Sequence, residues 1–205
     1  MKYGVLSEPL NFEDDNICSN LIFINELAED FLNKRKREKL NGVFIYVNFE
    51  KIYGINKKIL HSVSIKDKEF YSSFPCVNDI SYVYCKNRCS ISEENILCAS
   101  IFNRAICRYR MARISWLWEV IHLANIGDEN IKIWTKTFED KTTGAMNINK
   151  RFVWYKKGLA SYVIIFIEKF KDGKLNFLEF VTAYPVFTRR TEEQFIKAYD
   201  EYINS

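Results

Sequence analysis

The sequence is poor in the residues that build cofactor loops, linkers and most catalytic sites. Its 205 residues include 7 Gly, 3 Pro and 2 His. So few glycines and prolines argue against a Gly-rich phosphate loop and against a long flexible linker. The chain contains no HExxH, GxGxxG, Walker A or GxSxG motif, so the enzyme classes that depend on them have no support. Asp, Glu and His residues do not cluster at metal-ligand spacing, and we expect neither a metal site nor a cofactor.

Long apolar runs are also missing. No stretch approaches the roughly 18 consecutive apolar residues of a membrane-spanning helix. The first ten residues lack the basic and then apolar pattern of a signal peptide. The sequence therefore predicts a cytoplasmic protein without a membrane partner.

The six cysteines have two interpretations. In a cytoplasmic protein we expect reduced thiols that pack as small hydrophobic side chains. The alternative is a zinc site, but the C-x8-C-x3-C-x8-C spacing is not a familiar zinc pattern. That spacing is formed by Cys76, Cys85, Cys89 and Cys98.

The composition indicates a folded chain of one domain, or one domain with a helical N-terminal extension. Hydrophobic residues make up 48% of the sequence and aromatic residues 16%, whereas disordered chains are poor in both. The net charge of +4 permits a polyanionic partner without predicting one.

The N-terminal half shows one clear helix followed by weaker patterns. Apolar residues at three- and four-residue spacing predict a helix over Asn16–Leu40. Its last turn, Lys34–Arg37, is interpreted as a solvated basic end that complements the helix dipole, with a phosphate-binding patch as the alternative. Gly42–Phe49 is typical of a strand. From 56 to 88 we expect irregular structure with short strands near Ser62–Ile65 and Ser81–Tyr84, and then a helix from Ser92 toward Arg110.

The C-terminal half predicts a helix and then an antiparallel sheet. Ile114–Ala124 has helical spacing, and Asn125–Asp128 ends it. Asp172-Gly173 between two apolar runs is a strong hairpin signal. A closing helix begins at Thr191 as its N-cap. The expected strands are Ile131–Trp134, Arg151–Tyr155, Ser161–Phe170 and Leu175–Ala183. We therefore predict an α+β fold: N-terminal helices and short strands, then an antiparallel sheet of about four strands with helices packed on one face.

Arginine, tyrosine and threonine residues are concentrated on these C-terminal elements. Guanidinium groups bind phosphate in a bidentate manner, hydroxyls orient it, and aromatic rings stack on bases. Each residue also has an ordinary structural explanation, such as a salt bridge for Arg151 or strand propensity for Thr182. The set as a whole favours binding of a phosphodiester.

Five short motifs resemble the phage-associated members of the barnase, EndoU, colicin and RelE-like (BECR) nuclease superfamily. They are R-x4-R-I-x-W at Arg108–Trp116, the strand Ile131–Trp134, R-F-V-W-Y at Arg151–Tyr155, Y-V-I-I-F-I at Tyr162–Ile167 and F-V-T-A-Y-P at Phe180–Pro185. The resemblance implies a nuclease domain over 96–205 and leaves 1–95 as an extension or subdomain of unknown role. It implies a metal-independent endoribonuclease of toxin or phage-defence type, in which the 2′-hydroxyl attacks the phosphate and a 2′,3′-cyclic phosphate results.

The roles that the resemblance implies fall on two groups of residues. The expected catalytic residues are Arg113, Arg151, Thr182 and Tyr184. The expected RNA-binding residues are Arg108, Arg110, Trp116, Tyr155, Lys156, Lys157 and Arg189. RNA is the expected partner, and a toxin of this type would also have a cognate antitoxin or immunity protein.

Two other functions remain open at this point. No histidine or glutamate stands out as a general base, and this gap favours a non-catalytic RNA- or protein-binding module on the same fold. A structural protein that docks a partner through its aromatic surface is the third hypothesis.

Overall fold

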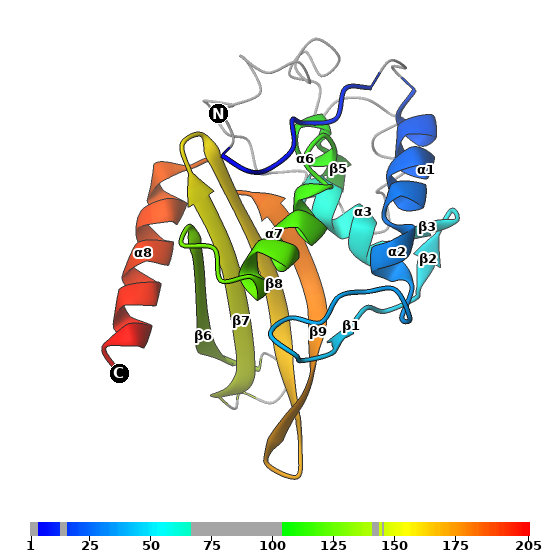
Figure 1. Ribbon diagram of the computed structural model, residues 1–205. Coiled ribbons are helices and arrows are strands. Elements are labelled where there is room, and N and C mark those ends of the chain that lie inside the picture. The colour runs from blue at the N-terminus through cyan, green and yellow to red at the C-terminus, as the bar shows by residue number, and fades with distance from the viewer. Residues whose placement is uncertain (1–3, 13–15, 67–103, 141–143, 145) are drawn as a thin grey trace.

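The computed structural model describes residues 4–12, 16–66, 104–140, 144 and 146–205 (Figure 1). In order, the elements are α1 (Ile17–Leu27), α2 (Glu29–Leu32), β1 (Ile45–Tyr46), β2 (Lys51–Ile52), β3 (Ile55–Asn56), α3 (Lys57–Val63), β4 (Ser64–Lys66), β5 (Arg104–Ile106), α6 (Arg108–Met111), α7 (Trp116–Asn125), β6 (Ile131–Glu139), β7 (Met146–Lys157), β8 (Ala160–Lys171), β9 (Lys174–Pro185) and α8 (Arg189–Ile203). The fold is α+β. No helix in these ranges is both long enough and apolar enough to cross a membrane.

The main sheet has the strand order β1-β9-β8-β7-β6. Strands β6 to β9 form the predicted antiparallel meander, and each of them is longer than the apolar pattern indicated. The fifth strand, β1, pairs in parallel with β9 through Ile45 opposite Leu178. Of the predicted strand Gly42–Phe49, only Ile45–Tyr46 joins the sheet.

The Asp172-Gly173 turn between β8 and β9 is confirmed. Both residues have positive φ angles, 52° and 74°, as a two-residue type I′ hairpin turn requires. Asp tolerates this conformation better than most residues and Gly adopts it freely. The turn therefore fixes the β8–β9 pairing locally.

Helices cover both faces of the sheet, so the expectation of helices on one face is wrong. Strand alternation places Val153 and Tyr155 of β7 on the face that packs against α7 and α3, which we call the core face. Phe152 and Trp154 lie on the opposite face, where they pack against Phe195 of α8; we call this the α8 face. Figure 1 shows α7 crossing the strands and α8 beside β6. Both faces of β7 are apolar, so its pattern alone did not show which face α8 would cover.

The N-terminal elements share one core with the meander. Ile24 of α1, Ile45 of β1 and Ile59 of α3 are fully buried in the same cluster as Ile164 and Phe180. The expected domain boundary at residue 95 lies outside the described residues. The described part of 1–95 is thus continuous with the rest of the core.

Several expected boundaries are corrected. The helix expected over Asn16–Leu40 is α1 followed by the short α2, and it ends at Leu32. Residues 57–63 form α3 where irregular structure was expected, and Arg104–Ile106 is a strand where a helix was expected. The N-cap of α8 is Thr188, whose hydroxyl accepts the Thr191 N–H, and not Thr191 itself. Ser81–Tyr84, the start of the helix at Ser92 and the four spaced cysteines lie outside the described residues.

Arg37 explains why the basic run does not continue the helix. Its side chain is buried and donates to the backbone carbonyls of Phe31, Leu32 and Ile45. Two of these carbonyls belong to α2, whose last turn would otherwise leave them unsatisfied. Burial lowers the pKa of the guanidinium to about 10. Arg37 is therefore neither part of a phosphate-binding patch nor a solvated helix end.

Replacement of Arg37 should destabilise the protein strongly. Arg37→Met keeps the apolar stem but leaves three buried carbonyls without a donor, and we expect the free energy of unfolding to fall by about 3 kcal/mol. The control is Arg35→Met, because the Arg35 side chain is exposed and its loss should cost less than roughly 0.5 kcal/mol. Urea unfolding of both variants measures the difference, and equal stabilities would contradict a capping role for Arg37.

Candidate active site at the junction of α6, β9 and α8

Arg151 and Thr182 lie on opposite faces of the sheet. Arg151 shares its face with Val153, the core face. Thr182 is paired with Ile165 and precedes Tyr184 by two residues, and both of these neighbours pack with the α8 face. The structure therefore does not bring these two expected catalytic residues to one phosphate.

Arg151 forms a closed ion pair on the core face. Its Nε and Nη2 donate to Glu168 Oε1 at 2.8 and 2.7 Å, and the Thr135 hydroxyl donates to the same oxygen at 2.9 Å. The Glu168 side chain is 5% exposed. Three adjacent strands contribute these groups, so the pair joins β6, β7 and β8. Sequence reasoning missed Glu168, although a single carboxylate in phase with Ile164 and Phe166 in an apolar strand was a usable signal.

Arg110 and Tyr184 do come together. Arg110, on α6, is 8% exposed, and its guanidinium carbon lies 4.9 Å from the centre of the Tyr184 ring. Its Nη1 donates to the Ser64 carbonyl at 2.7 Å. Its Nε is buried and has no hydrogen-bond acceptor among the residues that the structure describes. A buried guanidinium N–H without an acceptor is costly, so this position is suited to receive an anionic oxygen.

The amino end of α8 lies beside this guanidinium. A hollow of about 40 Å³ is lined by Arg110, Tyr184, Pro185, Val186, Phe187, Thr188 and Thr191. This volume can hold a few heavy atoms, such as those of one phosphate group. Thr188 and Thr191 bring hydroxyls that lie 2.6 Å apart. Helix amino ends favour anions through their N–H groups and their dipole. We call this hollow, with its seven lining residues, the Arg110 hollow.

An acid–base pair involves the residue that follows Thr191 of the Arg110 hollow in the chain. Glu192, in the first turn of α8, accepts from Lys156 Nζ at 2.7 Å. Their side chains are 23% and 37% exposed, so solvent and substrate can reach them. Lys156 is on the α8 face of β7, in phase with Trp154. Lys156 was an expected RNA-binding residue, whereas Glu192 was missed because the sequence does not show which strand α8 packs against.

Three expected site residues are buried in the core. Arg113 is 1% exposed, and its guanidinium carbon lies 3.6 Å from the centre of the Tyr109 ring. Trp116 is also 1% exposed and donates to the Ser7 carbonyl. Tyr155 is fully buried and its hydroxyl accepts from the Val5 N–H. Burial raises the pKa of the Tyr155 hydroxyl, while the Val5 hydrogen bond acts against this shift. These three residues were expected to contact RNA, but their side chains pack inside the protein.

The remaining expected RNA-binding residues are scattered. Arg108 is buried, at 5% exposure. Lys157 is exposed, and its side chain lies against Gly4. Arg189 begins α8 with a side chain that is 92% exposed and paired with Glu193. Of these three, Arg189 is nearest in sequence to the Arg110 hollow, directly after Thr188.

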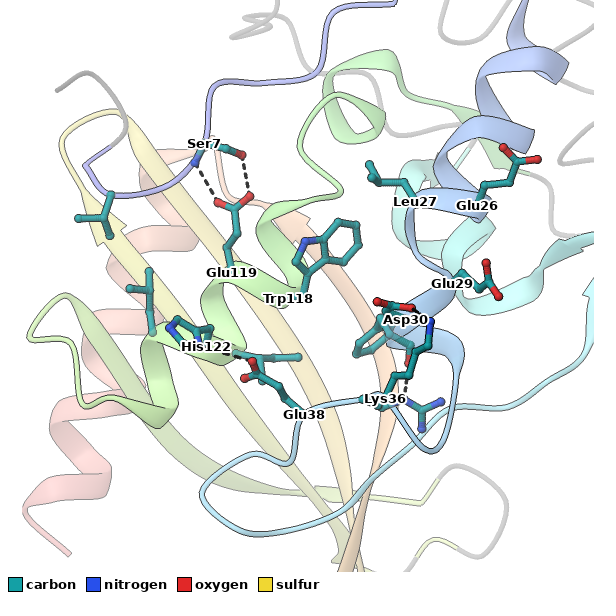
Figure 2. A pocket seen from close by; sticks show the side chains of 15 residues that line it. Ser7, Glu26, Leu27, Glu29, Asp30, Lys36, Glu38, Trp118, Glu119 and His122 are labelled. Carbon is teal, nitrogen blue, oxygen red and sulfur yellow. Dashed lines mark hydrogen bonds and ion pairs between the residues drawn. The ribbon is translucent and has the colours of Figure 1, made fainter.

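A much larger cavity lies elsewhere and is acidic. It has a volume of about 870 Å³ and is bounded by α1, α2, the segment before β1, and α7 (Figure 2). His122 lines it, is exposed, and lies 3.4 Å from Glu38 Oε1. Its described lining includes five carboxylates and only two of the cationic residues Lys and Arg. Such a surface repels phosphate, and this disfavours the cavity as a site for a polyanion.

Comparisons with protein-family models, with curated proteins and with solved structures found no match to this chain.

The Arg151–Glu168 pair should be structural. Glu168→Gln leaves a partly buried guanidinium without its counter-charge, and we expect the free energy of unfolding to fall by about 2 kcal/mol. The double variant Arg151→Met/Glu168→Leu should recover most of this loss, because apolar residues often replace buried pairs at little cost.

The matched control for this pair is Glu179→Gln on β9. Glu179 pairs with Lys169 at 3.2 Å in a more exposed position, so its loss should cost less than about 1 kcal/mol. Chemical denaturation of the four proteins completes the comparison. Equal losses for the two glutamate variants would show that the Arg151–Glu168 pair has no special role.

Proposed function

We propose that the protein is a metal-independent endoribonuclease whose active site is the Arg110 hollow together with Lys156 and Glu192. The observation that carries the proposal is the buried Arg110 Nε, for which the described residues provide no acceptor, on a side chain that lines the hollow beside the amino end of α8. The resemblance of the C-terminal motifs to BECR nucleases supports RNA as the substrate. The exposed Arg189 and Arg190 extend the positive charge outward from this end of α8.

Each group has a distinct part in the proposed reaction. Arg110 and the positive end of the α8 dipole hold the scissile phosphate and stabilise the charge that develops on it. Glu192 takes the proton from the 2′-hydroxyl as its oxygen attacks phosphorus. The bond from phosphorus to the 5′-oxygen then breaks, and Lys156 donates a proton to this leaving oxygen. The products are a 2′,3′-cyclic phosphate and a 5′-hydroxyl end.

A non-catalytic RNA-binding module is the second candidate. The close pairing of Glu192 with Lys156 favours it, because each group is already engaged by the other. Both candidates use the same phosphate contacts. They differ in whether bound RNA is cleaved.

The first experiment incubates the purified chain with total cellular RNA in EDTA and maps the fragment ends. We expect discrete fragments that end in 2′,3′-cyclic phosphate. Glu192→Gln should slow cleavage about 100-fold and retain RNA binding. Arg110→Lys, which keeps the charge but loses the Nε donor, should slow cleavage by a similar factor.

Arg151→Lys is the control that tests whether the effect is specific to the Arg110 site. It changes an arginine on the core face by the same substitution, and it should leave the cleavage rate unchanged. Melting temperatures of all variants show whether any loss of activity reflects unfolding. RNA that is bound but intact would support the binding module, whereas RNA that is neither bound nor cut would refute both functions.

A further inference from the structure

The acidic cavity in Figure 2 continues into an apolar surface on α1. Leu27 lines the cavity, and Phe23 lies one turn before it on the same side of the helix. Ile22, Phe23 and Leu27 are 52%, 48% and 39% exposed. The opposite side of α1 is buried in the core through Ile17, Leu21 and Ile24. Phe23 contacts the Phe12 ring edge-on, with ring centroids 6.5 Å apart. Even so, α1 exposes apolar side chains on the side opposite its buried face.

Trp118 forms the facing wall of the cavity. It projects from α7 into the space opposite α1 and α2 (Figure 2) and is only partly buried. An aromatic wall opposite an apolar helix forms a groove. This arrangement is suited to the apolar side of an amphipathic helix, which places anchors at three- and four-residue spacing. We call the cavity together with Ile22 and Phe23 the α1–α7 groove.

The charges around the groove are unbalanced. The carboxylates in its lining are Glu26, Glu29, Asp30, Glu38 and Glu119, and the cations are Lys36 and Arg37. Lys36 is paired with Asp30, and Arg37 donates to backbone carbonyls away from the groove. Glu26 and Glu29 are exposed. They also line a neighbouring hollow that contains Lys34, Arg35 and Lys51, but these three cations do not line the groove. With five carboxylates against two cations, the lining therefore presents a net negative charge to an incoming ligand.

We propose that the α1–α7 groove binds an amphipathic, basic helical segment of a partner protein. Its apolar side would contact Phe23, Leu27 and Trp118, while its Lys and Arg side chains meet Glu26, Glu29 and Glu38. The charge of the rim selects against RNA. It also selects against a second copy of this chain docking through α8. Around the exposed Ile196 of that helix, three carboxylates (Glu193, Asp200 and Glu201) outnumber one cation, Lys197.

Trp118 provides a direct signal for occupancy of the groove. The other three tryptophans, Trp116, Trp134 and Trp154, are each 1% exposed. A neutral quencher such as acrylamide therefore acts mainly on Trp118. The probe is a synthetic helical peptide of Leu and Lys at amphipathic spacing, and the matched peptide has Glu in place of every Lys.

We expect the Leu/Lys peptide to protect Trp118 from quenching and the Leu/Glu peptide to have no effect. The double variant Glu26→Gln/Glu29→Gln should bind the Leu/Lys peptide about fivefold to tenfold more weakly. The control, Glu193→Gln/Glu201→Gln, makes the same change in net charge on α8 and should bind like the unaltered chain. All four positions are exposed, so the folded state should persist in both variants.

This experiment tests peptide binding only, so its result does not depend on whether the protein cleaves RNA. Protection by both peptides would show that charge does not select the partner, and equal weakening by the two double variants would show binding elsewhere. Either result overturns the proposal. Absence of Trp118 protection at millimolar Leu/Lys peptide overturns it as well.

Discussion

The burial of the meander on both faces is the constraint on which the rest of the structure depends. Strand β7 alternates Phe152 and Trp154 with Val153 and Tyr155, and all four side chains are buried. An antiparallel sheet can leave one face to water, but this one needs two covers. The side chains of the core face pack against α7, α3 and the N-terminal elements, and those of the α8 face pack against α8. Burial of this one sheet therefore requires both the N-terminal elements and α8.

This two-sided arrangement also separates the charged features of the molecule. The α1–α7 groove belongs to the helices of the core face and carries carboxylates. The Arg110 hollow lies where α6 meets the end of β9 and the start of α8, and its charged lining residue is an arginine. Two ligands of opposite charge could thus be bound without competing for one surface. The proposed RNA site and the proposed partner site are independent in this sense.

Local sequence signals were sufficient to predict much of the fold. Pairings between residues far apart in the chain could not be predicted, because no local pattern encodes them. The Asp172-Gly173 turn and the alternation of β7, β8 and β9 are encoded within a few residues, so the meander was predictable. The parallel addition of β1 depends on contacts between Ile45 and Leu178, which no local pattern reveals. The site residues were affected in the same way. Tyr184 was expected to be catalytic, but its neighbour Arg110 was expected only to bind RNA. The catalytic arginine expected on this segment was Arg113, which is buried against Tyr109. Strand alternation gives the faces within one strand, and only the register between strands shows that Arg151 and Thr182 point apart.

The closure of the core by the N-terminal segment has a consequence for synthesis of the chain on the ribosome. Gly4 fits so closely against the Tyr155 hydroxyl that an added Cβ would lie 2.2 Å from it, and Ser7 accepts from Trp116 and donates to Glu119. Residues made first are therefore held by residues made more than a hundred positions later. Contacts of such long sequence separation slow folding, because the loop must close before the contacts form. The apolar side chains of the N-terminal elements share a core with β8 and β9. Their burial therefore depends on the emergence of these later strands, and emergence of the N-terminal elements alone does not permit folding.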